Sequence, residues 1–193
     1  MQSKLPLALG AIALIMGSAV VCADSGNIDA KVATCNGCHQ PGGAGPFPAI
    51  NGQPAEYLKN ALLEYKESHR PATMMSPALL GGLSDSDIAG LAEHFSKQPW
   101  TSVKNQKLDP ALVKRGKDIA EDKCAMCHGA GGRDSYDDMP RLGGQRAAFL
   151  VTEMEEYHDP HGKAHQPHGM KRAIKGLSAD DMQALAAYFA SQE

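Results

Sequence analysis

The sequence has few aromatic residues and no excess of positive charge. Phe, Trp and Tyr make up 5% of its 193 residues, with a single Trp. Two small domains built from such a chain would have thin cores unless a bulky apolar cofactor filled them. Lys and Arg number 19 against 22 Asp and Glu, far from the basic excess that nucleic-acid binding requires. The length also excludes a long multidomain enzyme.

Residues 1–23 have the pattern of a secretory signal peptide. Lys4 precedes a long uncharged apolar stretch, and Val21-Cys22-Ala23 fits a cleavage site before Asp24. The same stretch is just long enough to form an uncleaved membrane anchor, and Cys22 is a weaker candidate for lipidation. We favour export, which places the mature chain in an oxidising compartment where cysteines can form disulfides.

Four of the five cysteines lie in two copies of the motif C-x-x-C-H, at 35–39 and 124–128. This is the attachment motif of a c-type haem, because two thiols on one turn can add to both vinyl groups while the next residue binds the iron. Disulfides, a zinc site or a thioredoxin-type pair would not explain a His after both second cysteines. We therefore predict two covalently attached haem c groups, bound by Cys35, Cys38 and His39, and by Cys124, Cys127 and His128.

The two halves of the chain remain similar beyond these motifs. Gly52-Gln53 matches Gly144-Gln145, and each pair precedes apolar residues at helical spacing. A Gly-Leu-Ser sequence then leads into an amphipathic closing helix in both halves, with Ser84 and Ser178 as N-caps. The repeat predicts tandem domains at 24–98 and 109–193, joined by a linker at 99–108.

The opening helices are expected to differ. Asp109-Pro110 predicts the cap and first residue of a helix that runs to Lys123. Few residues separate Asp24 from Cys35, so the first half should have a shorter opening helix.

These residues resemble the two-haem cytochromes of the c4 type, which are two class I cytochrome c domains in tandem. The resemblance rests on the two haem motifs, the Gly-Gln before each middle helix, a Met upstream of each Gly-Leu-Ser, and closing helices with Phe95 and Tyr188-Phe189. It implies an all-α fold in which each domain wraps one haem, with a His below the iron and a Met thioether above it.

The resemblance places the distal Met on the loop between the middle and closing helices. That loop contains Met74 and Met75 in the first half and Met170 in the second. We favour Met75 over Met74, because Ser76-Pro77 after it resembles the family's ligand loop. A thioether favours Fe(II) and raises the reduction potential. We interpret the remaining methionines of the domains as core-filling residues: Met126, Met139, Met154 and Met182.

A histidine-rich segment precedes Met170: His158, His161, His165 and His168. We favour a solvated loop, with a surface copper or zinc site and replacement of Met170 by an imidazole as the alternatives.

The resemblance also implies a backbone carbonyl that orients each proximal histidine. Pro46 or Pro48 would serve His39, and Pro140 would serve His128. Arg141 would either pair with a haem propionate or be solvated.

Two six-coordinate irons leave no position for a substrate, so the resemblance implies an electron carrier rather than an enzyme. We expect it in the periplasm, with loose membrane association, taking electrons from a membrane quinol-oxidising complex or a dehydrogenase and passing them to a terminal oxidase. The alternative is the cytochrome subunit of a sulfur-oxidising dehydrogenase, such as flavocytochrome c sulfide dehydrogenase or thiosulfate dehydrogenase. A gas sensor or peroxidase ranks last, because both halves offer a distal Met.

Overall fold

The computed structural model describes residues 27–193 except residues 44, 71–74, 76 and 164–167. The predicted signal peptide, Met74 and His165 therefore lie outside the described residues. Within the described part of the chain there is no β-strand, and one isolated bridge joins Tyr136 and Met139. No helix in that part is long and apolar enough to cross a bilayer.

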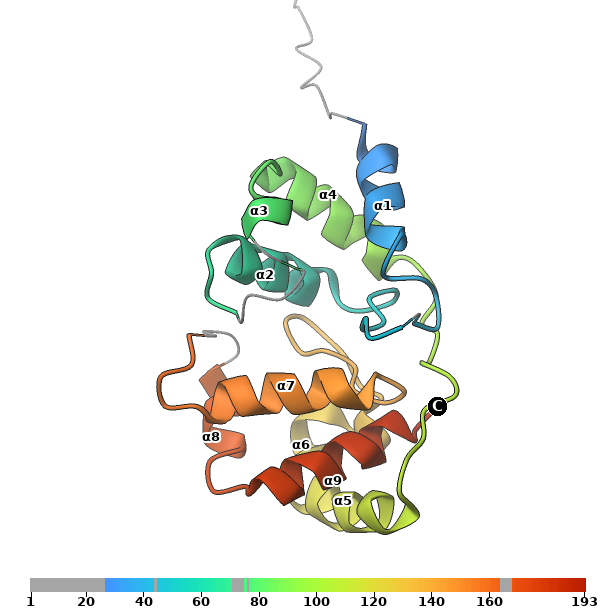
Figure 1. Ribbon diagram of the computed structural model, residues 1–193, viewed down its shortest axis with the longest axis vertical. Helices are drawn as coiled ribbons and strands as arrows, with labels where there is room; N and C mark the ends of the chain where they lie inside the picture. Colours follow the sequence, from blue (N-terminus) through green and yellow to red (C-terminus); the bar gives the residue numbers. More distant parts are fainter. Residues whose placement is uncertain (1–26, 44, 71–74, 76, 164–167) are drawn as a thin grey trace, which may run out of the picture.

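The helices form two groups, one above the other in Figure 1, as an all-α tandem fold requires. The first group contains α1 (Ile28–Asn36), α2 (Ala55–Lys66), α3 (Pro77–Leu80) and α4 (Asp85–Ser96). The second group contains α5 (Pro110–Lys123), α6 (Ala125–His128), the 3₁₀ helix η1 (Ala130–Gly132), α7 (Ala147–His158), α8 (His168–Ala173) and α9 (Ala179–Ala190).

The helix boundaries agree with the capping residues expected from the sequence. The Ser84 and Ser178 hydroxyls each accept a hydrogen bond from the backbone N–H three residues on, and the Asp87 and Asp181 carboxylates accept one from the backbone N–H of the cap serine. Each closing helix thus begins with a complete capping box. Asp109 caps α5 by accepting from Ala111 N at 2.8 Å.

Each half has its own hydrophobic core. The first is formed by Val32, Leu58, Leu91, Ala92 and Phe95. The second is larger and is formed by Ala120, Leu150, Met154, Tyr157, Ile174, Leu177, Met182, Leu185, Ala186, Tyr188 and Phe189. Most of these residues occupy the helical positions that the sequence pattern assigned to the buried faces.

The opening helix crosses the closing helix differently in the two halves. In the second half, a Cβ atom at Gly116 of α5 would lie 1.9 Å from the carbonyl oxygen of Ala184 in α9. Only a residue without a side chain permits so close an approach of the two backbones. The first-half opening helix α1 has 9 residues against the 14 of α5, and its Ile28 lies against Gly90 of α4.

Residues 99–109 connect the two groups without regular secondary structure. Val103 is buried and donates its backbone N–H to the carbonyl of Gly144 at 2.7 Å. Lys104 pairs with Glu193 at 3.0 Å, so the C-terminus lies beside this connection, as Figure 1 shows. The connection also lies against the first half, where a Cβ atom at Gly52 would come within 2.8 Å of Trp100 N.

Candidate haem-binding sites

The two C-x-x-C-H segments adopt the same backbone turn. In the first half the turn continues α1, and Cys38 N and His39 N bond to Cys35 O at 3.1 and 2.9 Å. In the second half, Cys127 N and His128 N bond to Cys124 O at the same two distances. Both cysteines of a motif therefore lie on a single helical turn, with the histidine immediately after it.

Each motif histidine is buried and fixed by a proline carbonyl. His39 Nδ1 lies 3.0 Å from Pro48 O, and His128 Nδ1 lies 3.2 Å from Pro140 O. Because a carbonyl oxygen only accepts, Nδ1 carries the proton and the lone pair is on Nε2. Burial lowers the pKa of both imidazoles, although the proline carbonyls oppose this shift. Each ring is therefore a neutral ligand with its Nε2 free to bind iron.

The proline interactions settle one choice left open by the sequence. Pro48, rather than Pro46, orients His39, and Pro140 orients His128 as the resemblance implied. Phe47 lies beside the His39 ring, with 6.0 Å between the ring centroids.

No disulfide joins the four motif cysteines. Cys35, Cys38 and Cys124 are half-buried, and Cys127 is exposed. Burial raises the pKa of the Cys35 thiol, and it raises the pKa of the Cys124 thiol to about 11. Two thiols on one turn beside a neutral imidazole form a donor set that fits a covalently attached haem.

The expected distal residues lie between the middle and closing helices. Met75 is half-buried and lies just before α3. Met170 is half-buried in α8 and packs against the second hydrophobic core. His158 ends α7, and His161 is exposed in the loop that follows. Among the described side chains, no three His, Cys, Asp or Glu residues cluster as a metal site would require.

Two interpretations of individual residues change with the structure. Met154 and Met182 are buried as expected, but Met126 is 93% exposed, so its assignment to the core was wrong. Met126 lies between the two cysteines of the second motif, and the neighbouring Cys127 is exposed as well. The Arg141 guanidinium lies over the Trp100 ring, 5.2 Å from the centroid, which neither interpretation of that arginine included.

A buried ionic cluster between the two halves was not anticipated from the sequence. Arg70, which follows α2, bonds Glu64 of its own half at 2.7 Å. The same guanidinium bonds Glu153 and the Tyr157 hydroxyl on α7 of the other half. Burial raises the pKa of the Glu153 carboxyl, while the Arg70 charge opposes the shift. The partners are more than 80 residues apart in the chain, so no local pattern indicates the contact.

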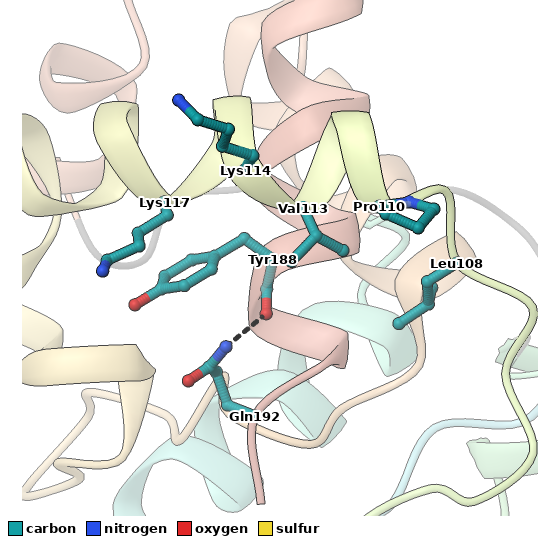
Figure 2. Close-up of a pocket in the computed structure, with 7 residues that line it drawn as sticks. All are labelled: Leu108, Pro110, Val113, Lys114, Lys117, Tyr188 and Gln192. Carbon is teal, nitrogen blue, oxygen red and sulfur yellow. Dashed lines mark hydrogen bonds between the residues drawn. The ribbon is translucent and has the colours of Figure 1, made fainter.

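A separate groove lies outside the haem motifs (Figure 2). It is lined by Leu108, Pro110, Val113, Lys114, Lys117, Tyr188 and Gln192. Within it, Gln192 Nε2 donates to the carbonyl of Tyr188 at 3.1 Å. The groove contains none of the predicted cysteine, histidine or methionine ligands, and we assign it no part in binding haem.

Comparison with known proteins identifies the family. The family described as Cytochrome c matches residues 113–193. A cytochrome c4 of Pseudomonas aeruginosa is 31% identical over 75% of this chain and 76% of the relative. This chain belongs to the cytochrome c4 family. It therefore carries two covalently bound haem c groups and serves in electron transport.

Further matches support the fold of the whole chain. The crystal structure of reduced cytochrome c4 from Pseudomonas stutzeri superposes with a TM-score of 0.74 at 27% identity, covering 86% of this chain and 97% of that one. A protein of Stutzerimonas stutzeri named thiosulfate dehydrogenase electron acceptor is 28% identical over 82% of this chain and 77% of the relative. The chain is thus similar over most of its length to cytochromes c4 and also to a thiosulfate dehydrogenase electron acceptor.

Proposed function

We propose that the two C-x-x-C-H turns hold the two haems of this cytochrome c4. Cys35 and Cys38 form the thioethers of the first haem and His39 its proximal ligand. Cys124, Cys127 and His128 have these roles for the second. The supporting observation is that both turns have the same backbone bonds and end in a neutral histidine fixed by a proline carbonyl.

Met75 and Met170 are the sixth ligands in this proposal. Both are half-buried in the segment between the middle and closing helices, and Met170 packs against its domain core. The domains extend over 24–98 and 109–193 with the linker at 99–108. The separate core clusters of the two halves support this division.

The protein acts as a periplasmic electron carrier and not as an enzyme. When bound, each haem supplies a reversible one-electron Fe(III)/Fe(II) couple. Burial keeps His39 and His128 neutral, and the proline carbonyls orient them. The methionine sulfurs of Met75 and Met170 would fill the remaining coordination position that a substrate would need. A membrane quinol-oxidising complex or a dehydrogenase donates the electrons, and a terminal oxidase accepts them. Export through residues 1–23 places the protein in the periplasm, and mass spectrometry should find a mature chain that begins at Asp24.

A potentiometric titration of the purified holoprotein tests the ligands. Met-ligated ferric haem has a far-red absorption band, and we expect it at two-haem intensity with both haems titrating at high potential. Met75→Ala and Met170→Ala should each remove half of the band. Met74→Ala is the matched control and should keep all of it. A high-spin haem in the wild-type protein, or loss of the band in Met74→Ala, would contradict the assignment.

A second candidate is the electron acceptor of a thiosulfate dehydrogenase. The named acceptor from Stutzerimonas stutzeri, similar over most of this chain, favours it. Stopped-flow mixing of the oxidised protein with a thiosulfate dehydrogenase and thiosulfate should reduce both haems quickly if this candidate is right. If reduction is slow there but fast with a quinol-oxidising complex, the respiratory carrier is the better assignment.

A further inference from the structure

Two buried glutamines connect the halves of the molecule. Gln53 and Gln145 are each only 2% exposed. The Gln53 amide donates to Arg141 O and accepts from Arg141 N, both at 2.9 Å. The Gln145 amide donates to Ala49 O and accepts from Ala49 N, both at 2.8 Å. Each glutamine therefore binds both backbone polar groups of one residue in the opposite half.

The residue held by each glutamine follows the proline that orients a proximal histidine. Pro48 O and Ala49 N belong to one peptide group. Its oxygen accepts from His39 Nδ1, and its N–H donates to Gln145 Oε1. A continuous chain of hydrogen bonds thus runs from a histidine of the first half to a glutamine of the second.

The same chain exists in the reverse direction. The peptide group between Pro140 and Arg141 accepts from His128 Nδ1 at 3.2 Å and donates to Gln53 Oε1 at 2.9 Å. Figure 1 shows the loop before α7 reaching toward the segment that precedes α2, where these contacts form. The arrangement is therefore reciprocal, and each half supplies the glutamine that the other half's histidine requires.

A hydrogen bond at one end of a peptide group strengthens the bond at its other end. An acceptor on the N–H shifts electron density to the carbonyl oxygen, which then accepts more strongly from the histidine. A stronger acceptor at Nδ1 makes the imidazole a more basic iron ligand. A more basic axial ligand stabilises Fe(III) relative to Fe(II) and lowers the reduction potential.

We propose that Gln53 and Gln145 are positioning residues that set the reduction potential of the haem in the opposite half. Gln53 acts through the Pro140 carbonyl on His128, and Gln145 acts through the Pro48 carbonyl on His39. This inference rests on the proposed haem ligands. It gives the interface between the halves an electronic role in addition to holding the domains together.

The test uses the reduced, diamagnetic holoprotein labelled with ¹⁵N and ¹³C. Gln53→Met keeps the side-chain volume and removes both amide bonds. It should move the His128 Nδ1–H resonance to lower frequency, speed its exchange with solvent and leave the His39 proton unchanged. Gln145→Met should have the same effects on the His39 Nδ1–H resonance and leave the His128 proton unchanged. In titrations of the same samples, the potential of the haem opposite each substitution should rise. If a Met variant does not accumulate, Gln53→Asn or Gln145→Asn, too short to reach both partners, replaces it.

Gln106→Met is the matched control. Gln106 of the linker also uses both ends of its amide on backbone groups, Gln145 O and Ala147 N, but neither group belongs to a peptide that binds a proximal histidine. Gln106→Met should leave the Nδ1–H resonances of both His39 and His128 unchanged. Equal shifts at both histidines, no shift at either, or the same shift in the control would overturn the inference. Wild-type protein without two haems attached at 35–39 and 124–128 would instead overturn the proposed function, and the inference with it.

Discussion

The two halves of the molecule build the same haem-attachment turn in different surroundings. In the second half the turn follows a 14-residue helix, and the closing helix α9 has eight buried residues. In the first half it ends a 9-residue helix, and the closing helix α4 has four buried residues. The backbone bonds of the turn nevertheless have equal lengths in both halves. The site geometry thus depends on the turn and its proline carbonyl, and not on the length of the opening helix.

The smaller core of the first half is accompanied by strong contacts across the interface. Gln145 binds its backbone at Ala49, and Arg146 Nε donates to Phe47 O at 2.9 Å. Arg70 links the Glu64 carboxylate of α2 to Glu153 of the second half. We infer that the first half depends on the second for much of its stability, and the predictions below test that dependence.

Removing the Arg70 charge should have the largest effect. Arg70→Met leaves the Glu64 and Glu153 carboxyls buried without their cation, which costs about 3–5 kcal/mol of unfolding free energy in comparable buried pairs. Because this contact joins the halves, urea unfolding of the holoprotein should separate into two transitions, with the first half unfolding earlier. Intrinsic Trp100 fluorescence and the visible haem spectrum would follow them.

Lys59→Met is the control for this experiment. Lys59 forms an exposed pair with Glu56 at 3.3 Å within α2, and loss of such a pair changes stability by less than about 1 kcal/mol. A single unchanged transition in Arg70→Met would show that the first half does not depend on the Arg70 contact for its stability.

Glycine substitutions at the helix crossings should have the next largest effect and opposite outcomes in the two halves. Gly116→Ala forces its Cβ into Ala184 O, so we expect a loss of about 1–3 kcal/mol or more. At Gly90, the added Cβ would lie 3.3 Å from Ile28 Cδ1, the end of a flexible side chain. Gly90→Ala should therefore be near neutral, or gain up to about 1 kcal/mol from helix propensity. Thermal unfolding followed by far-UV circular dichroism measures both, and equal losses would contradict the proposed difference in packing.

The features that the sequence predicted correctly are local. Asp109-Pro110 and the Ser84 and Ser178 caps each depend on residues within one helical turn, so a short pattern contains the physical cause. The contacts between the halves do not depend on residues that are close together in the sequence. Gln53 was matched to Gln145 as a repeated residue, but its partner lies 88 positions away, and an amide bonded to a backbone leaves no pattern in the sequence. Gly116 likewise gives no sign of the helix that it contacts.

The smallest expected effect is in acid, where the two capping boxes differ in what lowers the pKa of their aspartates. The pKa of Asp87 falls to about 2, chiefly through its bond with Lys31 of α1 at 2.5 Å. The pKa of Asp181 also falls to about 2, chiefly through the Ser178 backbone and hydroxyl, with Arg115 contributing less. Both carboxyls bind protons more weakly when folded, so their stabilising effect is present above pH about 4 and is lost as the pH falls toward 2.

Substituting the two cations should separate the halves in this pH range. Lys31→Met should raise the pKa of Asp87 more than Arg115→Met raises that of Asp181, because the Ser178 bonds remain in the second half. Carboxyl ¹³C shifts, recorded between pH 2 and 5 on the holoprotein, measure both values. Equal changes in the two pKa values would mean that the serine caps contribute the same fraction of the pKa lowering in both halves. A larger shift of Asp87 would mean that the contact between α1 and α4 compensates for a shorter opening helix by an ion pair, where α5 and α9 use close backbone packing instead.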